Sequence, residues 1–173
     1  MEGKSMTEEN NQAAAGSSKG EKAAPKFAVQ RIYLKDLSFE TPMGPAVFQK
    51  QLNPEINQDI ALSTTKLGKD NYEVELTLTV TVKDGEDVIY LIEVHQGGIF
   101  AIQGVEGPQL AQLLNTICPS TLFPYVREAI DNVVLKGGFP ALMIPPVNFD
   151  ALFAKAVEEG KLQGKDGSES ITH

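Results

Sequence analysis

The stretch Tyr72–Ile102 constrains the fold more than any other part of the chain. In its first half, Tyr72–Val82, apolar side chains occupy every second position, with Glu or Thr between them. Successive side chains of a β-strand leave opposite faces, so this pattern predicts a strand with one face on a core and one in water. Asp84-Gly85 predicts a turn, because Gly tolerates positive φ and Asp favours turns. Residues Val88–Val94 then predict the second strand of a hairpin.

The outward face of this hairpin is mixed. The alternation predicts that Tyr90, Ile92 and Val94 share the core face, while the outward face holds Ile89, Leu91, Glu93 and His95. A face that combines leucine with glutamate predicts a surface that contacts a partner.

The rest of the chain supplies two more strands and two helices. Phe27–Phe39 and Glu55–Leu67 alternate as strands, although the first has no purely polar face, which favours coverage on both sides. Apolar residues at helical spacing predict one long helix after Pro108, kinked at Pro119, and a short helix Phe149–Glu159. Strands followed by helices predict an α+β fold with a four-stranded antiparallel sheet.

Composition limits the domain count and the class of partner. The 173 residues fit one domain, 27–160. It lies between a polar N-terminal tail, 1–26, expected to be disordered, and a polar C-terminal tail, 161–173, expected to be flexible. The net charge of −8 argues against nucleic acid and anionic membranes. No secretory segment or apolar run of membrane-spanning length occurs, so a cytoplasmic location is predicted.

No catalytic or metal-binding constellation stands out, so neither an enzyme nor a cofactor is predicted. Gly97-Gly98 and Gly104–Gly107 lack a phosphate-loop motif and predict a bulge and a strand-to-helix turn. Cys118 lies on an apolar stripe without a neighbouring base, which is typical of a buried, unreactive thiol. The two histidines of the chain offer little for metal binding.

Two proline-bearing loops, 40–54 and 139–147, carry many apolar side chains. They either close the core or form an adaptable apolar groove, since Met and irregular loops can repack around different ligands. The candidate groove residues are Met43, Val47, Phe48, Leu52, Phe139, Leu142, Met143, Ile144 and Phe149. Separately, Asp36, Glu40 and Glu93 near Leu91 form either ordinary surface or an acidic dock for a basic partner.

Several long motifs of the chain resemble the SecB family of bacterial protein-export chaperones. They cover about Phe27 to Glu159 and include QRIYLKDLSFE, YEVELTLTVTV, EVHQGGIFAIQGVEG, CPSTLFPYVREAI and FPALMIPPVNFDALF. The resemblance implies an ATP-independent holdase that binds unfolded precursor proteins in apolar grooves beside the two loops. It also implies delivery of these clients to the translocation ATPase SecA.

The same resemblance implies an assembly and a docking site. The family forms a homotetramer, a dimer of dimers, with the long helix at the interface between dimers. The implied interface residues are Ile92, Val94, Gln96, Leu113, Ile117, Phe123 and Ile130. The zinc-containing C-terminal segment of SecA is implied to dock on Asp36, Glu40, Leu91 and Glu93.

The chain departs from the family pattern at two positions. It has no tryptophan, and Leu52 stands where some members carry one, while Ile92 stands at a position that can be cysteine. The groove is therefore expected to be apolar but less aromatic. Two alternative functions remain open at this point: a SecB-like chaperone dedicated to one client such as an antitoxin, and a monomeric carrier of small apolar molecules.

Overall fold

The computed structural model describes residues 24–161 and 171–172. Its strands are β1 (Lys26–Glu40), β2 (Glu55–Lys66), β3 (Asn71–Asp84), β4 (Asp87–Gln103) and the two-residue β5 (Ile171–Thr172). Its helices are the 3-10 helix η1 (Gly44–Gln49) and the α-helices α1 (Gly107–Asn115), α2 (Ile117–Lys136) and α3 (Phe149–Glu158). The predicted tails lie largely outside the described residues.

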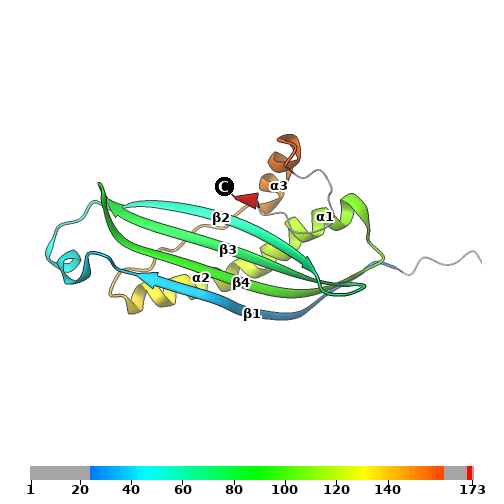
Figure 1. The fold of residues 1–173 in the computed structure, drawn as a ribbon, viewed down its shortest axis with the longest axis horizontal. Coiled ribbons are helices and arrows are strands. Elements are labelled where there is room, and N and C mark those ends of the chain that lie inside the picture. The colour runs from blue at the N-terminus through cyan, green and yellow to red at the C-terminus, as the bar shows by residue number, and fades with distance from the viewer. Residues whose placement is uncertain (1–23, 162–170, 173) are drawn as a thin grey trace, which may run out of the picture.

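The strands form one antiparallel sheet in the order β1-β4-β3-β2-β5. The segment around η1 therefore carries the chain from one side of the sheet, at β1, to the other, at β2. Helix α2 lies along one face of the sheet, which we call the helix face, and the opposite open face carries no helix (Figure 1). The predicted α+β fold with four antiparallel strands is confirmed, and β5 adds a short pairing to β2.

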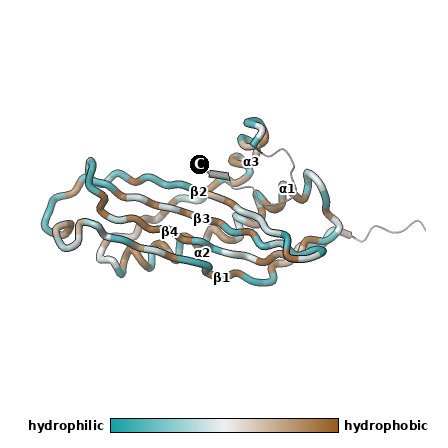
Figure 2. The backbone as a smooth tube through the Cα atoms, viewed as in Figure 1, coloured by the Kyte–Doolittle hydropathy of each residue, from teal (hydrophilic) through white to brown (hydrophobic). Residues whose placement is uncertain are grey.

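Strand β3 follows the predicted alternation. Val74, Leu76, Leu78 and Val80 are completely buried on the helix face, while the residues between them are partly exposed on the open face. Figure 2 shows the alternation of hydrophobic and hydrophilic residues along the strands. The hairpin turn also forms as predicted, with Gly85 at φ 59°.

The predicted outward placement of Ile89 is wrong. Lys83 pairs with Val88, whereas Val82 pairs with Tyr90, so Ile89 is an extra residue in β4. Such a bulge shifts the alternation by one residue. As a result Ile89 and Tyr90 are both buried.

Two bulges also explain the mixed pattern of β1. Its register with β4 shifts between Val29 and Arg31 and again between Leu34 and Asp36, which leaves Gln30 and Lys35 without direct partners. Each shift reverses the phase of the alternation. Residues paired with the buried positions of β4 are consequently almost all apolar: Phe27, Val29, Ile32, Leu34, Leu37 and Phe39.

The predicted bulge at Gly97-Gly98 does not form, because the pairing of β4 with both neighbours is continuous there. The two glycines instead make room for bulky side chains. A Cβ atom on Gly97 would lie 2.6 Å from the Tyr33 ring, and one on Gly98 would lie 2.7 Å from Leu122 and from Phe100. The glycine pair thus allows close packing on both faces of the sheet.

The predicted long helix is broken at Thr116 and not at Pro119. Thr116 leaves helical geometry with φ −122° and separates α1 from α2. Pro119 lies in the first turn of α2, where a backbone N–H has no intrahelical acceptor and its absence costs nothing. Pro124 lies inside α2, so the second helix continues through a proline.

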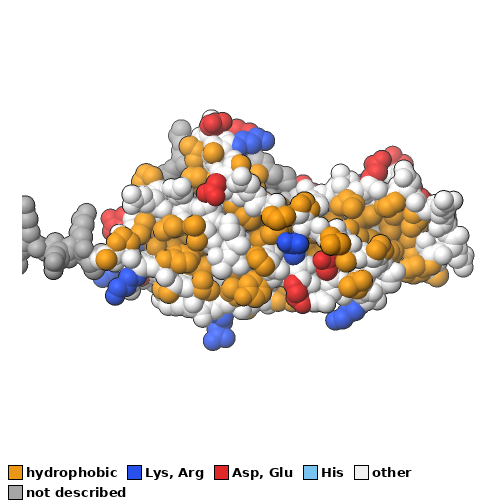
Figure 3. Space-filling view, turned by 180° about the vertical axis from the view of Figure 1, so that it is seen from behind, with side chains coloured by type: hydrophobic (Ala, Val, Ile, Leu, Met, Phe, Trp, Pro, Cys, Tyr) orange, Lys and Arg blue, Asp and Glu red, His pale blue; other side chains and the backbone are white. Residues whose placement is uncertain are grey.

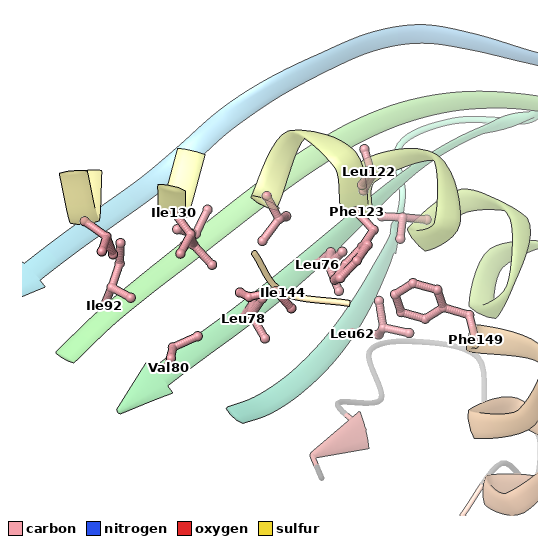
Figure 4. Close-up of a cluster of buried hydrophobic side chains, with 14 of the residues drawn as sticks. Leu62, Leu76, Leu78, Val80, Ile92, Leu122, Phe123, Ile130, Ile144 and Phe149 are labelled. Atoms are coloured by element: carbon pink, nitrogen blue, oxygen red, sulfur yellow. The ribbon is translucent and has the colours of Figure 1, made fainter. Parts of the chain in front are cut away.

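The core lies between the sheet and α2. In Figure 4, Leu122, Phe123 and Ile130 of α2 project toward the sheet, and Ile144 lies beside Leu78. Ile144 belongs to the irregular segment 139–148, the return loop, which connects α2 to α3. The return loop therefore contributes to the core as well as to the surface.

Candidate functional site

The open face brings the four predicted docking residues together. Antiparallel pairing places Asp36 opposite His95 and Glu40 opposite Leu91, and Glu93 lies in β4 between these two pairs. Directly paired residues share a face of the sheet. We call the surface formed by Asp36, Glu40, Leu91 and Glu93 the acidic face.

His95 occupies the centre of a hydrogen-bonded cluster beside the acidic face. Its Nδ1 lies 2.7 Å from Glu75 Oε1 and 3.1 Å from Thr77 Oγ1, and its Nε2 lies 2.9 Å from Glu93 Oε1. Thr79 donates a hydrogen bond to the other carboxylate oxygen of Glu93. Partial burial disfavours charge on His95, but the hydrogen bonds to Glu93 and Glu75 raise its pKa above the ordinary value. The hydrogen bond from His95 lowers the pKa of Glu93 in turn.

Lys35 neutralises the carboxylates next to this cluster. Its Nζ lies 2.5 Å from Glu75 and 3.2 Å from Glu73, and the Tyr33 hydroxyl also donates to Glu73. Within the described residues, Asp36 and Glu40 form no ion pair. The acidic face therefore keeps carboxylates that are free to meet a cationic partner.

An apolar groove of about 340 Å³ lies on the helix face, near the β3–β4 turn. Its lining is almost entirely apolar and comes from the segment before β2, the strands β2, β3 and β4, and the return loop. The lining residues are Leu52, Pro54, Ile56, Val82, Ile89, Tyr90, Phe139, Pro140, Ala141 and Leu142. Figure 3 shows hydrophobic side chains gathered over this end of the molecule on the helix side.

An aromatic cluster forms one end of the groove. Phe139 lies 4.7 Å from Tyr90 and stacks on Phe48 at 5.3 Å between ring centroids. Phe39 contacts both Tyr90 and Phe139. Burial, and to a smaller extent the charge of Asp131, raises the pKa of Tyr90 to about 12, so its phenol stays neutral.

The predicted groove residues occupy four kinds of position. Leu52, Phe139 and Leu142 line the groove. Phe48 and Met143 are exposed beside it, while Met43 is half-buried against the core. The remaining three are core residues: Val47, Ile144 and Phe149.

Sequence reasoning missed much of the lining. Ile89 and Tyr90 line the groove together only because of the bulge, which no pattern in the sequence indicated. Ile56 had a signal, since it is an exposed isoleucine on β2 that alternates with polar residues. Pro140 and Ala141 lie in the loop already singled out as apolar.

The seven residues predicted at subunit interfaces differ in how exposed their side chains are in the single chain. Leu113 is partly exposed and Ile117 is exposed. The other five are covered by this chain itself: Ile92, Val94, Gln96, Phe123 and Ile130. In the single chain these five side chains therefore offer little surface of their own to a second copy.

Residues 24–161 and 171–172 contain neither a cluster of metal-binding side chains nor a membrane-spanning helix. No group of three or more His, Cys, Asp or Glu side chains there could hold a metal ion. None of the helices in that part is long and apolar enough to cross a membrane. Cys118 is fully buried, and burial raises the pKa of its thiol to about 12, as expected for an unreactive cysteine.

Comparison with known families identifies the chain. Residues 20–160 match the family model described as SecB, preprotein translocase subunit SecB. The chain belongs to the SecB family. The resemblance predicted from the sequence motifs is therefore confirmed, and the matched region includes the acidic face, the groove and all three α-helices.

Two curated relatives support this assignment over nearly the whole chain. Protein-export protein SecB of Marinobacter nauticus is 52% identical over 95% of this chain and 99% of its own length. Protein-export protein SecB of Cellvibrio japonicus is 48% identical over 92% of this chain and 94% of its own. The SecB relatives and this chain are thus similar in length as well as in sequence.

A solved structure shares the fold. It is a SecB-like chaperone of Mycobacterium tuberculosis in complex with a peptide from the HigA1 antitoxin. The likeness has a TM-score of 0.54 and 14% identity, and covers 70% of this chain and 88% of the other. At this level of identity the comparison supports the SecB architecture alone.

Proposed function

We propose that this protein is an ATP-independent holdase chaperone that binds unfolded precursor proteins and keeps them competent for export. The observation that carries the proposal is the family match. Two relatives named protein-export protein SecB are 52% and 48% identical in sequence over more than nine-tenths of the chain. The apolar groove supplies a chemical means of capture. Each Leu or Phe of a client that is buried there contributes about 1.5–3 kcal/mol at most.

Client capture is proposed to extend beyond the groove itself. Phe48 and Met143 expose large apolar side chains beside it, and Ile56 is half exposed within it. Several weak contacts along one extended chain add through multivalency and need no sequence specificity. The protein then holds a precursor when capture is faster than folding or aggregation of that precursor.

Delivery is proposed to use the acidic face. The zinc-containing C-terminal segment of SecA is basic, and the carboxylates of Asp36, Glu40 and Glu93 provide the complementary charge, with Leu91 as an apolar contact. Charge complementarity favours rapid and specific encounter more than raw affinity. Clients and SecA would therefore bind opposite faces of the sheet.

Assembly is proposed to be a cytoplasmic homotetramer, a dimer of dimers. In support, α2 exposes Ile117, Tyr125 and Leu135, and the edge strand β1 exposes Phe27 and Leu34. A single chain with this much exposed apolar surface would gain from covering part of it with further copies.

The alternative of a chaperone dedicated to one client is less well supported. The only feature in its favour is the fold shared with the Mycobacterium tuberculosis chaperone in complex with an antitoxin peptide, at 14% identity. Binding of several unrelated unfolded precursors would support the general holdase. Binding of one client only would favour the dedicated chaperone.

The division between the two faces is tested with Glu93→Lys. This change should weaken binding of a zinc-loaded SecA C-terminal peptide at least about fivefold, because it removes an attraction and adds a repulsion. Capture of an unfolded precursor and the fourfold mass expected from light scattering should not change. Added salt should weaken peptide docking more than client capture.

The matched control is Glu86→Lys, which makes the same charge change at the exposed tip of the β3–β4 hairpin. Glu86 precedes Glu93 by seven positions, and the six residues between them span about 20 Å, which exceeds the Debye length at physiological salt. Loss of client capture in Glu93→Lys with normal peptide docking would contradict the proposed division. Equal weakening by both changes would show that only net charge matters.

A further inference from the structure

The return loop is held to α2 at few points. Phe139 N donates to Val134 O at 3.1 Å at its start, and Phe149, just beyond its end, packs on Phe123. Between these points, the only loop N–H groups that donate a hydrogen bond in the described structure are those of Leu142 and Met143, and both donate to Asp131. The loop contains three prolines, which have no N–H to donate.

The carboxylate of Asp131 binds two successive loop amides. Its Oδ1 accepts from Leu142 N at 3.0 Å and from Met143 N at 3.3 Å. Hydrogen bonds to an ionised acceptor are stronger than those between neutral groups. Asp131 is half-buried on α2, so both amides are fixed to a regular helix.

The backbone adopts a left-handed conformation at the same place. Met143 has φ 49°, and it is the only non-glycine residue with positive φ in the described part of the chain. This region disfavours residues with a long side chain and persists only where surrounding contacts enforce it. In this conformation Met143 is exposed, whereas Leu142 lines the groove and Ile144 is buried in the core.

We propose that Asp131 is the positioning residue of the apolar groove, because its carboxylate fixes the left-handed conformation of Met143 and so holds Leu142 in the groove wall. Four of the ten lining residues come from the return loop, and Leu142 directly precedes Met143. The influence of the Asp131 charge on Tyr90, another lining residue, agrees with this position beside the groove. The proposal rests on the groove being the client site, as proposed above.

The experiment compares Asp131→Ala with Asp131→Asn in the full chain. Alanine removes the acceptor and favours the helix, whereas asparagine keeps an oxygen that accepts from both amides. Alanine should speed amide exchange at Leu142 and Met143 at least about tenfold, and should weaken binding of a fluorescent peptide of alternating leucine and serine at least about fivefold. Asparagine should stay within about twofold of the wild type in both measurements.

Two further variants separate positioning from general damage. Glu128→Ala also removes a carboxylate from α2, but its partner is Asn132 and not the loop, so exchange and binding should stay at the wild-type level. Asp131→Ala with Met143→Asn should recover binding, because asparagine tolerates positive φ and lowers the need for the carboxylate. If Asp131→Ala fails to fold, the double variant is used in its place and is compared with Met143→Asn alone. Amide exchange at Leu142 should still be faster in the double variant, because only that variant lacks the Asp131 carboxylate.

Unchanged exchange at Leu142 and Met143 in Asp131→Ala would overturn the proposal, as would faster exchange with unchanged peptide binding. Failure of the wild-type protein to bind the peptide would instead overturn the client role of the groove. In that case the exchange data alone decide whether Asp131 positions the loop. The two failures are thus distinguishable.

Discussion

Gly98→Ala tests why two adjacent glycines lie within β4. A Cβ at Gly98 would lie 2.7 Å from Leu122 Cδ2 and 2.7 Å from the Phe100 ring. Both neighbours are completely buried between β4 and α2, so neither can swing into solvent. The φ of Gly98 is not positive, which means that the expected cost comes from packing and not from backbone strain.

The magnitude follows from two opposing effects. Overpacking of a close-packed core costs about 1–3 kcal/mol, while replacing Gly by Ala otherwise gains about 0.4–1 kcal/mol from reduced entropy of the unfolded chain. We therefore expect Gly98→Ala to lose about 1–2 kcal/mol of unfolding free energy. Gly68→Ala is the matched control, because nothing lies within 4 Å of its Cβ position and it should gain stability.

The assay is urea unfolding of both variants at one fixed protein concentration, since assembly makes apparent stability depend on concentration. The two variants should differ by about 2 kcal/mol, which corresponds to a separation of about 4–8 °C in Tm for a chain of this size. The double variant Gly98→Ala with Leu122→Val should be at least about 0.5 kcal/mol more stable than the sum of the two single changes predicts. The reason is that valine lacks the Cδ2 atom of Leu122 that the new Cβ contacts. Equal stability of Gly98→Ala and Gly68→Ala would refute the packing explanation.

Two further predictions concern the open face and the groove. His95→Gln removes a group whose pKa is raised in the fold despite partial burial, by hydrogen bonds to Glu93 and Glu75. Its stabilising effect is fully present below the unfolded pKa of about 6.5 and is lost as pH rises through the raised folded value. The wild-type advantage in urea unfolding should therefore shrink as pH increases, and a difference independent of pH would contradict this. Leu142→Glu should weaken the leucine–serine peptide at least about tenfold in fluorescence anisotropy, since a buried apolar contact contributes about 1.5–3 kcal/mol. Val157→Glu, an exposed position on α3, is the control, and equal affinities of the two variants would contradict the groove assignment.

The sequence alone predicted element types better than side-chain orientation. The strict alternation of Tyr72–Val82 identified β3 and its buried face because one uninterrupted period of two has a single interpretation. The bulges in β1 and at Ile89 reverse that phase, and they depend on pairing with a neighbouring strand. A single chain read in order contains no signal for such pairing, so the orientation of Ile89 was predicted wrongly.

The candidate site was predictable to a similar extent. The apolar content of the return loop indicated Phe139 and Leu142, which line the groove, but composition could not separate them from the core residues Ile144 and Phe149. That separation accompanies the positive φ of Met143, whose backbone amide donates to a carboxylate on another element. The proposed role of Asp131 could therefore not be predicted from the sequence, because it depends on contact between the return loop and α2.

The prolines of the return loop also disfavour aggregation of the protein through backbone pairing. A protein that keeps apolar surface open risks pairing with other copies through exposed backbone, as edge strands do in aggregation. Pro140, Pro145 and Pro146 remove every donor at their positions, and two of the remaining amides are occupied by Asp131. The loop can therefore expose apolar side chains while offering few adjacent backbone donors on which β-structure could grow.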